Sequence, residues 1–339
     1  MQMQSKEHIP KKRNPSEKMI IVTGGAGFIG SATVRYLNDL GISQIAIVDD
    51  LGSSDKWKNL VGKRFTEIVS IKDCFAWLQG REKDIGAIIH LGASANTVEA
   101  DADFLLENNY RFTVKLAEYA LKHNHRFIYA SSAATYGAGL EGFSDDHARL
   151  ELLHPLNMYG YSKHLFDLWA KSQGVLDQIV GLKYFNVFGP NEKHKGRMSS
   201  AITKMLPSAL QDGCIQLFKS SDLAQYGHGE QKRDFIYVKD VVKMTCAFLD
   251  NSAGGIFNIG SAAASTWNAL AHAVFKGLQR PAKITYVDMP QDLVGKYQNF
   301  TLADTSKAQR ALKEAAACIP LEAAVVEYVR NYLIPQRTW

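Results

Sequence analysis

Cysteine is scarce in this sequence, and long apolar runs are absent from it. The four cysteines stand far apart, without a Cys-x-x-Cys pair or a cluster of cysteine with histidine. This spacing excludes a zinc site and a disulfide framework, so we expect no metal and reduced thiols. No apolar stretch is long enough to span a bilayer, and the N-terminus is polar rather than signal-like. We therefore expect a soluble, cytoplasmic protein.

A strong excess of charge of one sign is also lacking. Over 339 residues the formal net charge is +5, with 46% hydrophobic and 22% charged residues, as in ordinary globular proteins. Residues 6–18 hold five Lys or Arg against two Glu, a net +3 that leaves about +2 for the rest. The folded part thus gives no case for nucleic-acid binding. Residues 1–18 are expected to be a disordered leader outside the fold.

A glycine-rich turn lies between a strand and a helix near the start of the chain. Residues 19–23 are rich in β-branched side chains, as in a strand that is buried on both faces of a parallel sheet. Gly24, Gly27 and Gly30 follow, and a helix continues to Leu40. In a dinucleotide-binding turn the first glycine allows the tight bend, the second the approach of a pyrophosphate, and the third close helix packing. The N–H groups at the start of the helix would then face the phosphates.

A second strand and two acids complete this βαβ unit. The strand is predicted over residues 44–48 and ends at Asp49 and Asp50. Asp49 lies 19 residues beyond Gly30, where an acid accepts a hydrogen bond from a ribose hydroxyl. Strand, glycine turn, helix, strand and acid together indicate a dinucleotide site.

The alternation of strands and helices continues to about residue 190 and then loosens. Further strands are predicted at residues 87–93, 126–132 and 178–188, and helices at 102–122 and around Tyr159. The later part has helices at 198–212, 240–250, 265–279 and 321–333, short strands at 215–218, 235–238 and 255–259, and a polar loop at 222–231. The pattern predicts an α/β fold with a doubly wound parallel sheet of Rossmann type over residues 19–190. Part of the later chain is expected to return to it, while residues 191–339 mainly form a smaller α/β substrate lobe.

Tyr159 and Lys163 are the first candidates for catalysis. They stand four residues apart on a predicted helix, so both project from the same face. A free tyrosine has a pKa near ~10, and a neighbouring cation favours its phenolate form. Ser132 ends a predicted strand at the sheet edge where ligands bind in open α/β folds.

Ser132, Tyr159 and Lys163, together with the glycine turn, resemble the catalytic set of the extended short-chain dehydrogenase/reductase family. The resemblance covers nearly the whole chain from Met19 onward. It implies that Lys163 binds the nicotinamide ribose and lowers the pKa of Tyr159. Tyr159 would exchange a proton with a substrate hydroxyl, and Ser132 would hydrogen-bond the same oxygen. Members of the family act mostly on nucleotide-sugars.

Within this family the sequence resembles the branch of ADP-heptose 6-epimerases. Residues 132–134 are Ser-Ala-Ala where dehydratases carry Thr-Asp-Glu, so the acids for water elimination are lacking. The strings particular to the branch are His-Lys-Gly at 194–196, Lys-Arg-Asp-Phe at 232–235 and Gly-Lys-Tyr-Gln at 295–298. The resemblance implies transient oxidation of C6 of the heptose to a ketone and its re-reduction on the other face, for lipopolysaccharide inner-core synthesis. Lys195 would be a second acid/base, opposite Tyr159.

The same resemblance implies two sets of binding residues and a homo-oligomer. Cofactor contacts are expected from Gly24, Gly27, Phe28, Ile29, Gly30, Asp49, Asp50, Lys56, Leu91, Gly92, Ala93, Asn108, Lys163, Val187 and Lys195. Contacts with the sugar nucleotide are expected from Ser132, Asn186, Arg197, Lys204, Phe218, Lys219, Ser220, Ser221, Arg233 and Tyr297.

The expected cofactor is NADP, with NAD as the alternative. Asp50 stands where the family usually has Asn, and two adjacent acids should repel a ribose 2′-phosphate. Lys56 matches the basic position that would receive that phosphate. Structural roles are the alternative elsewhere: Asn108 would hold a backbone kink and Arg233 would pair with Asp234. His90 is expected to be a hydrogen-bonded core histidine.

Two other functions compete with the heptose epimerase. A UDP-hexose 4-epimerase uses the same Ser, Tyr and Lys, but this function would give residues 194–196 no role in the reaction. A nucleotide-sensing regulator would commonly have lost Tyr159 or Lys163, and both are present.

Overall fold

The computed structural model describes residues 18–290 and 298–339, so the expected leader lies outside the described residues except for Lys18. Its centre is a seven-stranded parallel sheet with the order β10-β6-β5-β4-β1-β2-β3. The order grows outward in both directions from β1 and β4, so the predicted doubly wound Rossmann sheet is confirmed. The strands are β1 Met19–Thr23, β2 Ile45–Val48, β3 Glu67–Val69, β4 Ile85–His90, β5 Arg126–Ser132, β6 Val180–Tyr184 and β10 Gly255–Ile259.

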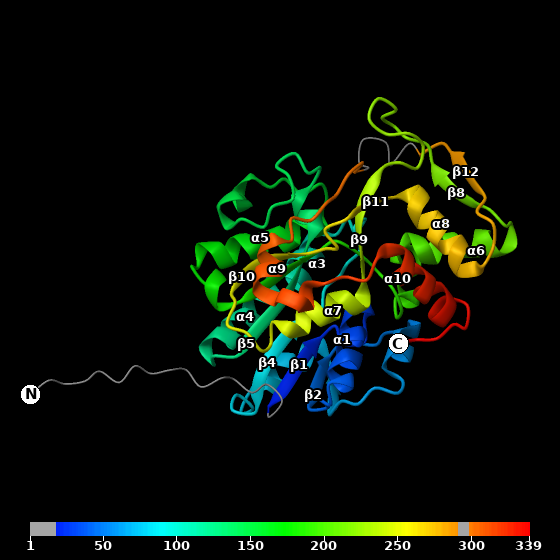
Figure 1. Ribbon diagram of the computed structural model, residues 1–339. Helices are drawn as coiled ribbons and strands as arrows, with labels where there is room; N and C mark the ends of the chain where they lie inside the picture. Colours follow the sequence, from blue (N-terminus) through cyan, green and yellow to red (C-terminus); the bar gives the residue numbers. More distant parts are fainter. Residues whose placement is uncertain (1–17, 291–297) are drawn as a thin grey trace, which may run out of the picture.

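Helices cover both faces of this sheet (Figure 1). One layer holds α1 Phe28–Asp39, α7 Val238–Ala247 and α9 Ser306–Leu312, and the other holds α2 Cys74–Leu78, α4 Phe112–Lys122 and α5 Met158–Ser172. Along β1, Ile20 and Val22 pack into the first layer and Ile21 into the second, which is why the strand is apolar throughout. No helix in the described parts of the chain is long and apolar enough to cross a membrane.

A smaller lobe has its own apolar core and lies to one side of the sheet (Figure 1). Its helices are α6 Ala201–Gln211, α8 Trp267–Leu278 and α10 Leu321–Tyr328. A three-stranded sheet of β11 Ala264–Thr266, β9 Lys232–Tyr237 and β7 Asn186–Phe188 lies between the parts, and β8 Ile215–Phe218 pairs with β12 Ile284–Val287. Phe28 and Ala32 of α1 belong to this lobe core, so the first helix joins both parts.

Two predicted strands are placed differently by the structure. The single strand expected at 178–188 is two strands, because the chain bends at Phe185 to leave the main sheet and pair with β9. The strand at 255–259, described above among the lobe elements, is the edge of the main sheet beside β6. An apolar run shows that a strand is buried and leaves open which sheet it joins.

Two boundaries also differ around the strand and helix of residues 85–122. β4 ends at His90, three residues before the prediction, and the last ladder bond to β1 is donated by the N–H of Leu91 to the carbonyl oxygen of Thr23. The helix expected at 102–122 consists of α3 Ala102–Leu105, a π-helical segment Leu106–Arg111 and α4. Such wide turns often mark functional sites.

The turn after β1 needs glycine at two positions. Gly24 has φ +65°, and a Cβ there would lie 2.7 Å from Cα of Gly92. A Cβ on Gly30 would lie 2.0 Å from the carbonyl oxygen of Gly24. Helix α1 therefore packs onto the turn closely enough to exclude any side chain.

Gly30→Ala should destabilise the protein by about 1–3 kcal/mol, because the added methyl group collides with backbone. Chemical unfolding would measure the change, with Gly227→Ala as the control since its nearest neighbour is the Glu230 side chain at 3.4 Å. Equal stability of the two variants would contradict this account of the turn.

Candidate active site

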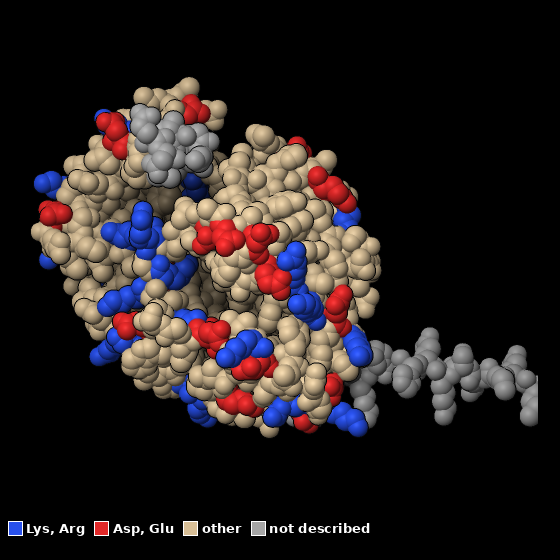
Figure 2. Space-filling model, turned by 180° about the vertical axis from the view of Figure 1, so that it is seen from behind, with Lys and Arg blue, Asp and Glu red and all other residues tan. Residues whose placement is uncertain are grey.

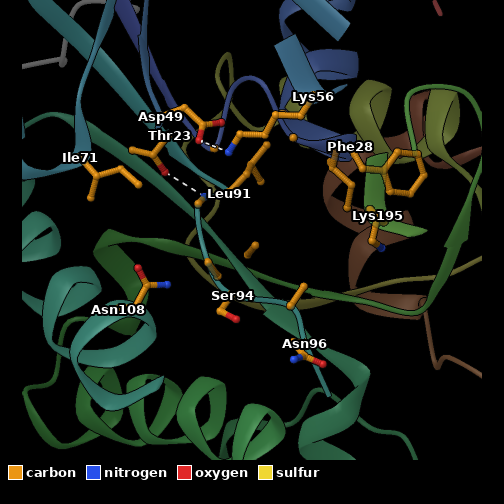
Figure 3. Close-up of a pocket in the computed structure, with 18 of the residues that line it drawn as sticks. Thr23, Phe28, Asp49, Lys56, Ile71, Leu91, Ser94, Asn96, Asn108 and Lys195 are labelled. Atoms are coloured by element: carbon orange, nitrogen blue, oxygen red, sulfur yellow. Dashed lines mark hydrogen bonds and ion pairs between the residues drawn. The ribbon is translucent and has the colours of Figure 1, made fainter. Parts of the chain in front are cut away.

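A cavity of about 490 Å³ opens at the carboxyl ends of β1, β2 and β4 (Figure 3). This is the point at which the strand order reverses, where open α/β sheets bind their ligands. Helix α1 begins here at Phe28, and its first turn has no side-chain cap. The N–H groups of that turn are thus available to an anion. Of the predicted cofactor contacts, the cavity is lined by Gly24, Gly27, Phe28, Ile29, Gly30, Asp49, Lys56, Leu91, Gly92, Ala93, Asn108 and Lys195.

A second cavity of about 510 Å³ adjoins the first and contains Ser132, Tyr159 and Lys163. The two cavities share part of their walls, so a ligand could extend from the glycine turn to the Tyr159 helix. The shared residues are Phe28, Ile29, Leu91, Ala93, Ala95, Ala130, Tyr184, Lys195 and Met198.

The catalytic candidates are brought together by the end of β5 and the start of α5. Asn157 caps α5 by accepting a hydrogen bond from the N–H of Gly160 at 2.8 Å. Lys163 Nζ donates to the carbonyl oxygen of Ala130 at 2.9 Å. Ser132 Oγ accepts from the N–H of Ala134 at 3.1 Å.

Burial controls the acidity of these groups. It raises the pKa of Tyr159, and a hydrogen bond with Ser132 acts in the opposite direction. Burial lowers the pKa of Lys163 to about 8, while Asp167 acts to raise it. In this structure desolvation outweighs the hydrogen bond with Ser132, so the lowering of the phenol pKa by Lys163 stays a prediction.

Lys195 lies where the two cavities meet. It belongs to a 3₁₀ segment Lys193–Met198, in which Gly196 turns the chain with φ +52°. Its Nζ is 5.3 Å from the centre of the Phe28 ring, and both side chains are labelled in Figure 3. Burial lowers its pKa, which Glu192 opposes. A cation in this position contacts the space beside Tyr159 and Lys163 as well as the first cavity.

A buried hydrogen-bond chain fixes the segment after β4. Thr23 Oγ1 accepts from the N–H of Gly92 at 3.0 Å and donates to His90 Nδ1 at 2.7 Å. His90 Nε2 then donates to Thr113 Oγ1 at 2.8 Å, because the Thr113 hydroxyl already donates to the carbonyl oxygen of Asn109 at 2.6 Å. His90 is therefore a satisfied core histidine, as expected, and it has one tautomer.

Asn109 continues this chain toward the catalytic helix. Its side-chain oxygen accepts a hydrogen bond from the N–H of Ser94 at 2.9 Å. Its side-chain nitrogen donates to the carbonyl oxygen of Ser94 and to Ser162 Oγ, both at 3.0 Å. Ser162 Oγ donates to the carbonyl oxygen of Tyr159 at 2.7 Å. Asn108, one residue earlier in the π-helical segment, donates to Asn109 Oδ1 and lines the first cavity. The wide turn of the helix thus places Asn108 in the cavity wall and Asn109 in the hydrogen-bond chain behind it.

The two adjacent acids after β2 have separate partners. Asp49 accepts from the N–H of Ala26 at 2.9 Å and from Lys56 Nζ at 2.7 Å, and it lines the first cavity (Figure 3). Asp50 accepts from Ser70 Oγ and the N–H of Ile71. Asp50 is not among the described residues that line either cavity, so the structure does not bring it together with the other predicted cofactor contacts.

The predicted substrate contacts are only partly brought together. Asn186, Arg197 and Lys204 line the second cavity, as does Val187 from the cofactor set. Figure 2 shows Lys and Arg side chains gathered beside a hollow on the face opposite to that of Figure 1. In the part of the chain that the structure describes, Phe218–Ser221 and Arg233 do not line these cavities, and Tyr297 lies outside it.

Arg233 and Asp234 do not follow the simple alternative of an ion pair. Asp234 is fully buried and accepts hydrogen bonds from Ser261, Ala262 and Ala303. The Arg233 guanidinium lies 5.9 Å from the ring of Trp267, which lines the second cavity. Successive residues of β9 point to opposite sides, which separates the two side chains.

Some lining residues were not predicted from the sequence. Ser94 and Asn96 lie in the loop after β4, so their position beyond a strand could have indicated them. Trp267 begins α8, more than 70 residues beyond any motif used for the sheet edge, and no sequence signal connects it to the site.

Residues 20–260 match the sequence model of the NAD dependent epimerase/dehydratase family. The chain belongs to this family. The resemblance to extended short-chain dehydrogenases/reductases is thereby confirmed, and the family's description names NAD as the cofactor on which its members depend.

Two kinds of similarity separate fold from substrate within the family. The chain is 51% identical over 322 residues to an ADP-L-glycero-D-manno-heptose-6-epimerase of Nitratidesulfovibrio vulgaris, covering 93% of this chain and 98% of the relative. The Helicobacter pylori enzyme of that name has a solved structure with TM-score 0.76 and 25% identity, covering 93% and 96% of the two chains. A UDP-N-acetylglucosamine 4-epimerase of Methanobrevibacter ruminantium is equally similar in fold, with TM-score 0.75, 26% identity and coverage of 96% and 100%. The fold is thus shared with epimerases named for different substrates, whereas the 51% sequence identity is to a heptose epimerase.

His90 should make stability depend on pH. Burial lowers its pKa to about 3, whereas an unfolded histidine titrates near ~6.5. Below that value the unfolded state binds the extra proton, so stability falls as pH falls toward 3. Between pH 7.5 and 5.0 this share of the unfolding free energy should decrease by about 2 kcal/mol.

Urea unfolding at the two pH values would test this for the wild type and His90→Gln. The variant should lose less stability on acidification than the wild type, whatever its stability at pH 7.5. His272→Gln, at an exposed histidine of α8, should retain the wild-type difference. The same pH dependence in His90→Gln and the wild type would show that His90 titrates normally.

Proposed function

We propose that this chain inverts C6 of ADP-D-glycero-D-manno-heptose to give ADP-L-glycero-D-manno-heptose, a precursor of the lipopolysaccharide inner core. The observation that carries the proposal is Lys195, which lies in the wall shared by the two cavities, one of which holds Ser132, Tyr159 and Lys163. Identity of 51% to a heptose epimerase over 93% of the chain supports the same substrate. Inversion by oxidation and re-reduction with one fixed hydride donor requires either that the sugar reorients or that an acid/base group lies on each side of the C6 oxygen. Tyr159 and Lys195 are two such groups.

The first cavity suits a nicotinamide dinucleotide. The uncapped start of α1 presents N–H groups to a pyrophosphate. The glycines at 24 and 30 let the turn and the helix pack closely enough to form that wall of the cavity. Leu91, Gly92, Ala93, Asn108 and Val187 would hold the nicotinamide half. When bound, the nicotinamide supplies the hydride acceptor and donor that side chains lack.

Four residues would handle the proton at the sugar oxygen. Tyr159 would take the proton from the C6 hydroxyl when the sugar is oxidised on one face, and Lys195 would give a proton to the C6 oxygen when the ketone is reduced on the other face. Ser132 would donate a hydrogen bond to the same oxygen. Lys163 is buried, and its ammonium donates one hydrogen bond to the carbonyl oxygen of Ala130. The positive charge of that ammonium would favour the phenolate form of Tyr159.

Lys195 would serve the opposite face of the sugar. Its pKa is lowered by burial, which brings an ammonium toward the range useful for proton transfer. Asn186, Arg197 and Lys204 would hold the substrate next to it. The remaining predicted contacts, Phe218, Lys219, Ser220, Ser221 and Arg233, would reach the nucleotide from the lobe, which we assign mainly to residues 191–339.

We assign NADP as the cofactor, with NAD as the alternative. Lys56 lies at the cavity wall beside Asp49, where a ribose 2′-phosphate would lie, and Asp50 is turned to Ser70 and Ile71. The Lys56 ammonium can leave the Asp49 carboxylate for a phosphate, whereas NAD would leave that ion pair intact. Self-association of the chain stays a prediction.

A UDP-hexose 4-epimerase is the second candidate, because solved 4-epimerases match the fold as closely as the heptose enzyme. That reaction uses one base on one face and gives Lys195 no proton to transfer.

The purified protein should interconvert the two C6 epimers of ADP-heptose without added cofactor, measured by chromatographic separation of the epimers. Lys195→Met should lower the turnover by about 10²- to 10⁴-fold, the usual contribution of an acid/base group, while bound nicotinamide is unchanged. Lys193→Met is the control, since Lys193 is exposed and donates to Gln336. Full turnover by Lys195→Met, or conversion of a UDP-hexose instead, would overturn the proposal.

Lys56→Ala should weaken NADP about 10- to 100-fold relative to NAD, because one charged contact to the phosphate is lost. The measurement is the affinity of each cofactor for the stripped protein. Lys58→Ala is the control, since Lys58 pairs with Asp55 at the surface. An unchanged NADP to NAD ratio in Lys56→Ala would favour NAD as the natural cofactor.

A further inference from the structure

A fully buried ion pair lies behind the catalytic residues. Lys183 of β6 and Asp167 of α5 are both inaccessible to solvent, with Nζ and Oδ2 2.7 Å apart. Asp167 also accepts hydrogen bonds from Tyr129 at 2.9 Å and Ser131 at 2.8 Å. Taking two charges out of water costs several kcal/mol per ion, so such a pair is weak evidence for added stability. The groups that the Lys183–Asp167 pair holds in place are therefore more informative than its own contribution to stability.

The pair anchors a directional hydrogen-bond chain that ends at Ser132. Lys183 Nζ is 2.5 Å from Thr135 Oγ1, which is 2.8 Å from the carbonyl oxygen of Ser132. An ammonium can only donate, so Thr135 accepts from Lys183 and gives its own proton to Ser132. Thr135 itself is fully buried, which leaves its hydroxyl these two partners.

The other end of the pair is fixed to the helix that carries the catalytic residues. Asp167 stands one helical turn after Lys163 and two turns after Tyr159 on α5. The chain of bonds from Asp167 through Lys183 and Thr135 to Ser132 thus connects α5 to the end of β5. It spans the two elements whose relative position sets the contact between Ser132 and the Tyr159 phenol.

We propose that Thr135, held by the Lys183–Asp167 pair, is a positioning residue that sets the place of Ser132 relative to Tyr159. The inference rests on the proposed function for its kinetic test. Backbone around Ser132 is otherwise a short 3₁₀ turn, Ala133–Tyr136, whose capping bond from Ala134 to Ser132 Oγ fixes the side chain within the turn. The Thr135 bond fixes the turn as a whole to the core.

The test compares Thr135→Val, which keeps the shape and removes the hydroxyl, with Thr135→Ser, which restores the hydroxyl. Thr135→Val should lower kcat for C6 epimerisation about 10- to 100-fold with KM changed less than twofold, because a misplaced group affects the reacting centre. Thr135→Ser should recover most of kcat. Tyr129→Phe is the matched control: it removes one hydrogen bond from the same ion pair without touching the chain to Ser132.

A second readout does not depend on the substrate. In protein labelled with ¹³C at the tyrosine ring, the Tyr159 Cζ resonance, assigned with Tyr159→Phe, should shift in Thr135→Val and return in Thr135→Ser. An unchanged kcat and resonance in Thr135→Val, or an equal loss of kcat in Tyr129→Phe, would overturn the inference. A wild type that leaves ADP-heptose unchanged would overturn the proposed function, and the resonance would then decide the positioning role alone.

Discussion

The close approach of two backbone segments governs the shape of the site. The turn after β1 touches the segment after β4 at Gly24 and Gly92, with no room for a side chain between them. Thr23 and His90 bind the two segments together through buried hydrogen bonds. Because α1 packs on the same turn at Gly30, the helix N-terminus and the loop that faces it form one rigid wall. A dinucleotide pocket at a strand reversal depends on this spacing.

Several buried polar groups around that wall are matched with partners. The Asp167 and Lys183 charges neutralise each other, His90 is satisfied as a neutral ring, and Glu192 accepts from Ser200, Thr203 and Tyr328. Lys163, which is buried, and Lys195, which is half-buried, face the cavities. Burial lowers the pKa of both ammonium groups, and such shifts are common at functional sites.

The segment that carries Lys195 illustrates how two parts of the fold share a site. It follows β7, which leaves the main sheet, and it precedes α6, the first helix of the lobe. His194 Nδ1 lies 3.1 Å from Asn59 Nδ2, and Asn59 also donates to Ala26 in the glycine turn. The loop is therefore fastened to the cofactor wall on one side and to the lobe on the other. Its lysine lies in the wall that both cavities share.

Local sequence determined the βαβ unit, the glycine turn and the order of the catalytic motifs, because each depends on neighbouring residues and a fixed period. It could also indicate Lys195 through a motif. It could not show that residues 178–188 divide between two sheets, since an apolar run looks the same in either. Nor could it reveal that Asp50 turns away from the cavity, that Trp267 enters it, or that Lys183 lies against Asp167. Those contacts join residues far apart along the chain. Only the tertiary structure decides them, because the cost of burying a polar group must be offset by the partners that packing brings to it.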